Sequence, residues 1–322
     1  MVKTQISHNI ELLARLLAAD ASFLTVREKL IFLDFLLKND DSSLFQTEKD
    51  FESRFLSLKL DDISFAVKRV FPRARWTSSD SLKKIKIAKR IMEVQEIKST
   101  SILDSDFPAM LREMKDPPFM LFYRGKLDIL NRKCLSVVGT RRAFPAALRA
   151  ATDFSRQACD DGLCVVSGLA FGIDGACHKG ALLSKNPATV AILPGGIDTI
   201  SPHSHTGLAA KILEKGGLLM SEYLPGTPPA QFRYVQRNRI VAALSPCTLV
   251  FQAAAGSGAM ITANLALDYN RELLFHSHCF SKEFEALSQK LCSKKSDSPA
   301  SFVEEGAKVI SDYDEFKKAM LL

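Results

Sequence analysis

Apolar and polar residues follow a helical pattern in the first third of the chain. Apolar side chains recur every three or four residues in Ile10–Leu17, Leu30–Leu37 and Ile85–Met92, the spacing of amphipathic helices. The polar run Asn39-Asp40-Asp41-Ser42 separates two of these helices. We therefore predict a small helical N-terminal domain over residues 1–97. A bridge over 98–132 follows, because Asp116-Pro117-Pro118 excludes a regular helix there.

A different pattern begins at Cys134, where short β-branched runs alternate with amphipathic segments. The predicted strands are Leu135–Val138, Leu163–Val166, Thr189–Leu193, Leu218–Met220, Thr248–Phe251 and Glu272–Phe275. The predicted helices cover 145–160, a segment from about 173, and then 206–215, 234–244 and 259–269. Apolar strands separated by helices are typical of a parallel sheet covered on both faces. We predict a Rossmann-like, doubly wound α/β domain over 133–322. It ends in a polar, loose segment Ser293–Ser301, a strand Lys308–Ile310 and a helix near 312–320.

Composition excludes several classes of protein. The 322 residues are 47% hydrophobic and 25% charged, which fits two soluble domains with a sizeable core. The most apolar stretch is Leu12–Leu24, and Arg15 and Asp20 interrupt it. No apolar run is therefore long enough to cross a bilayer. The N-terminus lacks the pattern of a secretory signal, so we expect a cytoplasmic protein. The seven cysteines are scattered without a C-x-x-C pair, which predicts core thiols in a reducing compartment.

Positive charge is concentrated in one segment of the helical domain. Residues 68–90 contain nine basic residues and one acid, a net charge of +8 against +7 for the whole chain. Phe71 and Trp76 lie inside this segment. The segment is either a lysine-coated helix face in solvent or a surface that binds phosphates, and the sequence leaves both open.

Small or glycine-rich turns follow several of the predicted strands. These turns are Gly139-Thr140-Arg141, Ser167-Gly168 with Gly172, Pro194-Gly195-Gly196, and Gly256-Ser257-Gly258. The carboxyl ends of parallel strands meet at one edge of a sheet, where helix N-termini offer free N–H groups. Glycine lets the backbone approach an anion, and hydroxyls of Thr140, Ser167, Ser257 and Thr262 add donors. The sequence therefore predicts an anion site at this edge.

The residues near these turns indicate which kind of anion the predicted site binds. No G-x-x-x-x-G-K-[ST] sequence is present, and Ile261 replaces the third glycine of a dinucleotide fingerprint. Arginines accompany the turns at positions 141, 142, 233, 237 and 239, interleaved with Phe232 and Tyr234. Arginine for phosphate and aromatic rings for bases are typical of a groove for single-stranded nucleic acid. The alternative is that these arginines pair with nearby acids, although Asp and Glu are sparse in this region.

Five segments resemble the DprA/Smf family of DNA-processing proteins in order and spacing. They are Asp104–Gly125, Val137–Arg141, Ser167–Leu182, Gln236–Ser245 and Ser257–Ala263. The resemblance covers roughly Asp104 to Phe275. It implies a Rossmann-like core that binds single-stranded DNA, forms a homodimer and helps to load the RecA recombinase during natural transformation. It also implies a helical, SAM-like N-terminal domain and no enzymatic activity, cofactor or metal.

The turns and the resemblance together define a predicted DNA-binding site. Within it, Arg141 resembles a base- and phosphate-contacting arginine, and Tyr234 takes the place of a phenylalanine. Asp174 and His178 match family motifs too, and for these we predict structural roles. The predicted DNA-binding residues are Gly139, Thr140, Arg141, Ser167, Gly168, Phe171, Gly172, Tyr234, Arg237, Asn238, Arg239, Ser257, Gly258 and Thr262.

Three features depart from the family pattern. His276-Ser277-His278 replaces a valine-proline-glycine segment, which alters one rim of the expected groove. Gln252 stands where an acid is common. The sequence ends at Leu322, so we expect no C-terminal winged-helix domain.

The sequence supports other functions less well than DNA binding. The pairs His203/His205 and His276/His278 could form part of a metal site, although loop histidines without such a role are commoner. The chain contains no G-x-S-x-G sequence, so the motif of a serine hydrolase is missing. Pro194-Gly195-Gly196 resembles part of the motif of lysine-decarboxylase-like phosphoribohydrolases, but the catalytic glutamate expected soon afterwards is missing. A further alternative is an interaction module with a degenerate site, in which changing Arg141 would leave function unimpaired.

Overall fold

A computed structural model describes residues 2–38, 45, 47–284 and 297–321. Its centre is a sheet with the strand order β1-β2-β6-β5-β4-β3-β7-β8-β9. All strands from β6 to β9 run parallel, whereas β2 pairs antiparallel with both β1 and β6. The predicted doubly wound parallel sheet is confirmed. The strands are β1 (Lys98–Ser101), β2 (Met120–Arg124), β3 (Cys134–Val138), β4 (Cys164–Ser167), β5 (Thr189–Ile192), β6 (Leu218–Ser221), β7 (Cys247–Val250), β8 (Glu272–His276) and β9 (Lys308–Ile310).

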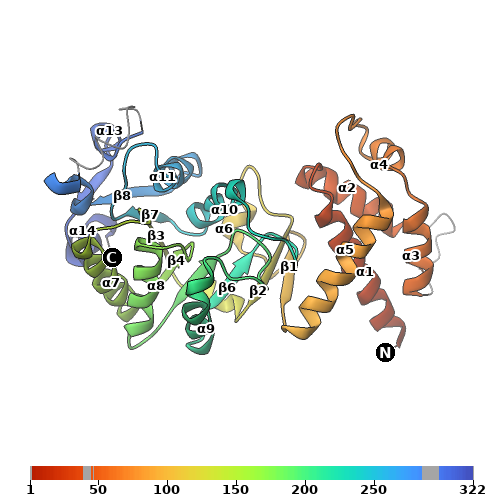
Figure 1. Ribbon diagram of the computed structural model, residues 1–322, viewed down its shortest axis with the longest axis horizontal. Helices are drawn as coiled ribbons and strands as arrows, with labels where there is room; N and C mark the ends of the chain where they lie inside the picture. The colour runs from red at the N-terminus through yellow and green to blue at the C-terminus, as the bar shows by residue number, and fades with distance from the viewer. Residues whose placement is uncertain (1, 39–44, 46, 285–296, 322) are drawn as a thin grey trace.

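Alternate residues of the strands point to opposite faces, and each face packs against its own helices. One layer contains α7 (Pro145–Asp160), α8 (Ile173–Leu183), α9 (Thr206–Glu214) and α14 (Tyr313–Met320). The opposite layer contains α10 (Gln231–Ala243), α11 (Gly258–Asp268) and α13 (Pro299–Glu304). In β3, for example, Leu135 and Val137 pack toward α7, whereas Cys134 and Val138 pack toward α10. Figure 1 shows the two layers below and above the sheet.

The order of the strands creates a switch point between β3 and β7. From β3 the chain adds β4, β5 and β6 on one side, and it then returns to add β7, β8 and β9 on the other. The connections after β3 and β7 therefore lead to opposite sides of the sheet, and in such folds ligands usually bind in a crevice at this position. The turn Gly139-Thr140-Arg141 lies at this switch point.

Residues 98–132 contribute strands that the sequence analysis did not predict. β1 and β2 extend the sheet beyond β6, and α6 (Ala109–Arg112) and η1 (Leu127–Asn131) lie in the same segment. Of the predicted loose segment Ser293–Ser301, residues 293–296 lie outside the described residues, and α13 begins within the remainder. Six cysteines are buried free thiols, as predicted, and Cys292 is outside the described residues.

The N-terminal region is a bundle of helices, and it lies beside the β1 edge of the sheet in Figure 1. Its apolar side chains form one continuous core with residues of the sheet, among them Phe119 and Phe122. The predicted break at residues 39–42 lies outside the described residues. None of the described helices combines the length and apolarity that a bilayer crossing requires. The helices are α1 (Val2–Asp20), α2 (Val26–Leu37), α3 (Glu48–Ser57), α4 (Leu60–Val67) and α5 (Ser78–Val94).

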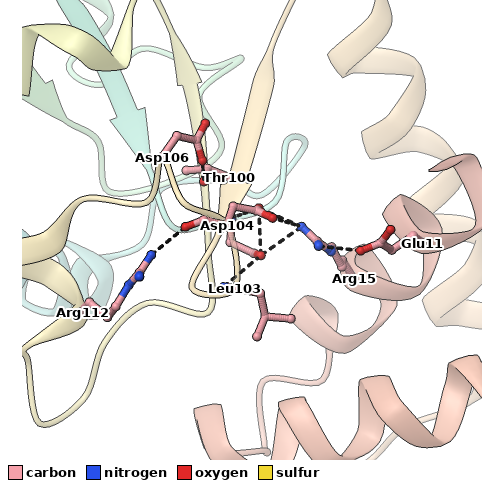
Figure 2. Close-up of polar contacts among 8 residues, drawn as sticks. Glu11, Arg15, Thr100, Leu103, Asp104, Asp106 and Arg112 are labelled. Carbon is pink, nitrogen blue, oxygen red and sulfur yellow. Dashed lines mark hydrogen bonds and ion pairs between the residues drawn. The ribbon is translucent and has the colours of Figure 1, made fainter.

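Arg15 and Lys29 of this bundle contact the sheet and its adjoining loops. Arg15 of α1 donates hydrogen bonds to Asp104 at 2.7 Å and to Ser101 at 3.0 Å, and it also pairs with Glu11 (Figure 2). Burial alone would raise the pKa of Asp104, but the hydrogen bonds from Arg15 and Ser101 lower it below its ordinary value. Elsewhere, Lys29 of α2 lies 5.8 Å from the centre of the Phe119 ring. Burial lowers the pKa of Lys29 to about 8.

The basic segment 68–90 is partly neutralised by neighbouring helices. Phe71 and Trp76 pack edge-to-face against aromatic rings inside the bundle, so they form part of its core. Four of the nine cations pair with acids of other elements, which favours the helix-face interpretation for these four. The pairs are Arg69–Glu28 at 3.0 Å, Lys84–Asp20 at 3.7 Å, Lys86–Glu52 at 2.7 Å and Lys89–Glu48 at 2.7 Å.

Candidate nucleic-acid interface

The turns after β3 and β4 are in direct contact at the switch point. Gly172 has a φ of +74°, and a Cβ at this position would lie 2.2 Å from the carbonyl oxygen of Thr140 and 2.7 Å from the carbonyl carbon of Arg141. The N–H of Ile173 donates to the same Thr140 oxygen at 3.3 Å. A side chain at position 172 has no room, so this close approach of two backbones requires glycine.

Gln252, two residues after the end of β7, joins a third loop to these two. Its backbone oxygen accepts a hydrogen bond from the N–H of Thr140 at 2.6 Å, and its Oε1 accepts one from the N–H of Phe144 at 3.0 Å. Its Nε2 donates to the carbonyl of His278 at 3.4 Å. A carboxylate could not make the last contact, which gives the departure at Gln252 a structural reason. Gly139 belongs to the same junction, since a Cβ there would lie 2.5 Å from Ile173 Cγ1.

Arg141 and Tyr234 form a cation–aromatic pair on the surface of this edge. Arg141 is exposed, and its Cζ lies 5.0 Å from the centre of the Tyr234 ring. The Tyr234 hydroxyl lies 2.6 Å from Ser201 Oγ, which fixes the ring. On the same helix, Arg233 lies over Phe232, whose side chain is 57% exposed. At the start of α10, Arg233 therefore lies in sequence between an exposed ring, Phe232, and a half-buried ring, Tyr234.

Arg237 is a buried cation beneath the loop after β4. Only 3% of the residue is exposed, and its Nη1 lies 1.3 Å from where a Cβ on Gly168 would be. Burial lowers the pKa of Arg237, and the neighbouring Asp174 opposes this effect. Burial likewise raises the pKa of Asp174, whose Oδ2 accepts a hydrogen bond from the N–H of Ala170 at 3.3 Å. Because a guanidinium keeps its proton in proteins, the loop after β4 has a fixed positive charge behind it.

His178 belongs to the core rather than to the surface of the site. Its Nδ1 lies 2.7 Å from Thr189 Oγ1, which itself donates to the carbonyl of Val165 at 2.8 Å. Burial lowers the pKa of His178 to about 3, and the charges of His205 and Arg237 act in the same direction. The imidazole is therefore neutral near pH 7, and its contacts are those of a structural residue.

The start of α11 has open backbone and hydroxyl groups at the predicted site. Ser257 is its N-cap residue, and the Ser257 Oγ is shielded from solvent and has no hydrogen-bond partner among the described residues. Gly258 has open space where a Cβ would be, so an anion could approach its N–H group closely. Asn238 of α10 donates to the Gly258 carbonyl at 3.2 Å and joins this element to the arginine-bearing helix.

For three predicted site residues the structure favours a structural role over contact with DNA. Ser167 Oγ is buried and donates to the carbonyl of Val137 at 2.7 Å, and Thr262 Oγ1 donates to that of Gly258 at 3.2 Å. Arg239 forms an ion pair with Glu222 and donates to the carbonyl of Asp116 at 2.7 Å. The pairing with acids considered in the sequence analysis is thus correct for Arg239.

The turn after β5 differs from the others because its glycines are packed against another loop. A Cβ on Gly195 would lie 2.9 Å from Pro229 N, and one on Gly196 would lie 2.9 Å from Gly226 N. These contacts explain both glycines without a phosphoribohydrolase site. In the described part of the chain, no group of three or more His, Cys, Asp or Glu side chains could hold a metal ion. His276 instead stacks on Phe251 and on His278.

The fold and this edge define a doubly wound α/β protein in which glycine turns and arginines lie together at the switch point of the sheet. The profile of the family described as DNA recombination-mediator protein A matches residues 98–320. The chain belongs to this family.

Relatives of known name agree with this assignment. The chain is 36% identical over 213 residues to Protein Smf of Escherichia coli strain K12, covering 66% of this chain and 54% of that protein. It therefore matches little more than half the length of that relative. It is 33% identical over 219 residues to DNA processing protein DprA of Streptococcus pneumoniae strain R6, covering 68% of this chain and 73% of that protein.

Two solved structures are similar to this chain, one over nearly its whole length and one over a part of it. The crystal structure of DprA from Streptococcus pneumoniae superposes with a TM-score of 0.67 at 28% identity, covering 92% of this chain and 94% of that one. DNA processing protein A from Helicobacter pylori, described for its single-stranded DNA binding mode, gives a TM-score of 0.56 at 27% identity. That match covers 70% of this chain and 96% of the other.

Proposed function

We propose that this protein binds single-stranded DNA at the crevice between β3 and β7. Phosphates bind to the exposed guanidinium of Arg141 and to the N–H groups at the start of α11. Bases stack on the rings of Tyr234 and Phe232. The protein acts by binding rather than by catalysis, and its DNA-bound form protects incoming strands.

The observation that carries this proposal is the pairing of Arg141 with Tyr234 beside the Gly172 turn. A guanidinium 5.0 Å from an aromatic ring at the open edge of a sheet presents a phosphate ligand and a stacking surface together. The buried charge of Arg237 adds a positive potential behind the same loop. Contacts of this kind do not read base edges, so we expect little sequence preference.

A titration with fluorescent single- and double-stranded oligonucleotides over a salt series tests the proposal. We expect tighter binding to the single strand, with a slope of log affinity against log salt of about −0.7 per phosphate contact. Equal affinities for single strand and duplex at moderate salt contradict the proposal. Hydrolysis of nucleoside monophosphates by the purified protein contradicts the non-enzymatic part of it.

We propose further that the DNA-bound protein is a homodimer and helps to load the RecA recombinase, in keeping with its family. Sedimentation analysis tests the dimer with and without DNA. Formation of RecA filaments on strands coated with single-strand-binding protein tests the loading, and we expect faster filament formation when the protein is added. An unchanged rate contradicts the loading step while leaving DNA binding intact.

A further inference from the structure

A second aromatic surface lies on the far side of the Gly172 turn. Phe171 is 49% exposed, and its ring packs edge-to-face on His205 with the ring centres 5.1 Å apart. His205 is fixed in turn, because its Nδ1 lies 2.9 Å from the carbonyl oxygen of Leu169. Leu169 itself is buried with a φ of +57°. The Phe171 ring is thus held in place by its support while much of its surface faces solvent.

This ring borders a shallow pocket of about 500 Å³ between α7 and α8. Arg149 of α7 and Lys179 of α8 line it, and both are exposed and have no ion pair in the described part of the chain. Asp153 is the acid that lines it, so two cations face one carboxylate. Thr152 lies between them and donates its hydroxyl to the carbonyl of Leu148 at 2.8 Å. An exposed ring beside an excess of cations fits a nucleotide, whose base is flat and whose phosphate is anionic.

The pocket is continuous with the proposed crevice through the Gly172 turn. Gly172 lines the pocket, and its Cβ position would overlap the backbone of Thr140 and Arg141. The backbone of Arg141 thus lies directly against a residue that lines the pocket, within reach of the next nucleotide of a strand held by Arg141. This continuity distinguishes the pocket from an isolated basic patch.

We propose that the pocket between α7 and α8 binds a nucleotide of the same DNA strand, adjacent to the one held by Arg141. Its base stacks on Phe171, and its phosphate lies between Arg149 and Lys179. The inference rests on the proposed function and deepens it, since it assigns the direction in which the strand leaves the crevice. It also gives Phe171 a binding role of its own, separate from the Tyr234 side of the site.

Fluorescence of a tryptophan in place of Phe171 tests the stacking directly. The chain has one native tryptophan, Trp76, which lies in the helical bundle and is kept in every variant. We expect the Phe171→Trp variant to lose fluorescence when a thymidine oligonucleotide is added. The control is Phe65→Trp, because Phe65 is 85% exposed on α4 in the helical bundle. Quenching equal to that of the control overturns the inference.

Affinity measurements separate this inference from the proposed function. We expect Phe171→Ala to bind single strands about tenfold more weakly, since stacking on an aromatic ring is worth about 1–3 kcal/mol per base. Arg149→Glu with Lys179→Glu is expected to make the salt slope less steep by about 0.7, because one phosphate contact is lost. If the wild type binds single strands and these variants match it, the inference is wrong while the proposed function stands. If the wild type binds no single strand, both are wrong.

Discussion

The guanidinium of Arg237 fills the space that a side chain at Gly168 would need. Nη1 of Arg237 lies 1.3 Å from the ideal Cβ position of Gly168, and its Cζ lies 2.2 Å away. The arginine is 3% exposed, so it has little freedom to move aside. The absence of a side chain at one loop residue thus allows a charge from α10 to lie directly under that loop.

Replacing Gly168 with alanine should therefore disturb the whole loop. The new methyl group overlaps the guanidinium of Arg237 and must displace this buried charge, which is costly. We expect the Gly168→Ala variant to lose about 2–3 kcal/mol of unfolding free energy and to bind single strands at least tenfold more weakly. Urea unfolding and fluorescence anisotropy measure the two effects. Gly207→Ala is the matched control, because nothing lies within 4 Å of the Cβ position there. Equal stability of the two variants contradicts the argument.

Arg141 should matter for binding and not for folding. Its side chain is exposed, and in the described part of the chain it has no acidic partner. A hydrogen bond to a charged group is worth about 1.5–3 kcal/mol, so Arg141→Ala is expected to weaken single-strand binding about tenfold or more. Anisotropy measures the loss, and an unchanged thermal midpoint shows that the fold is intact. Arg27→Ala, an exposed arginine in the helical bundle, is the control. If both variants bind as the wild type does, Arg141 is not in the site.

Arg239, two residues beyond Arg237, should show the opposite behaviour. Arg239 forms an ion pair with Glu222, and the side chains of the two residues are 16% and 15% exposed, respectively. Removing one member of a largely buried pair leaves the other charge unpaired, so Arg239→Ala is expected to lose about 3 kcal/mol of unfolding free energy. Glu222→Gln in the same chain should recover part of this loss, because a neutral amide is easier to bury. Calorimetry of the single and double variants measures the coupling. A large loss of DNA affinity with an unchanged thermal midpoint would instead assign Arg239 to the DNA site.

The sequence predicts the sheet well because each strand is a short apolar run between two helices. β1 and β2 were missed because these antiparallel strands of four and five residues carry no such alternation with long helices. The sequence also predicts the meeting of the Gly139, Ser167 and Gly258 turns, since the carboxyl ends of parallel strands share one edge.

Side-chain partners are the part of the site that the sequence could not supply. Arg237 and Arg239 are two positions apart in one motif, yet one lies under the loop after β4 and the other pairs with Glu222. Their positions on α10 differ by about 200° around the helix axis, so they face different neighbours. Which neighbour each one meets depends on the packing of distant segments, such as Asp116 and Gly168. The contact of Gln252 with Thr140 is of the same kind, because it joins residues more than a hundred positions apart.

His178 should make the protein sensitive to acid. The unfolded chain binds a proton at the ordinary pKa of about 6.5, whereas burial holds the pKa of the folded His178 at about 3. Between these values the unfolded state binds more protons than the folded state. The unfolding free energy should therefore fall as the pH is lowered from 6.5 toward 3, by up to about 1.4 kcal/mol per pH unit. Because burial also lowers the pKa of His276 to about 4, that residue contributes in the same direction.

Urea unfolding of wild type and His178→Asn at pH 7, 6, 5 and 4.5 separates the contribution of His178 from that of His276. Asparagine keeps a donor near Thr189 Oγ1 but has no titratable group, and its smaller volume lowers the stability at every pH. The quantity to compare is therefore the slope of unfolding free energy against pH, which should be shallower in the variant below pH 6.5. His203→Asn, at an exposed position of η2 (His203–His205), should leave the slope as it is in the wild type. Equal slopes in all three proteins would mean that His178 takes up its proton in the folded state as readily as in the unfolded chain.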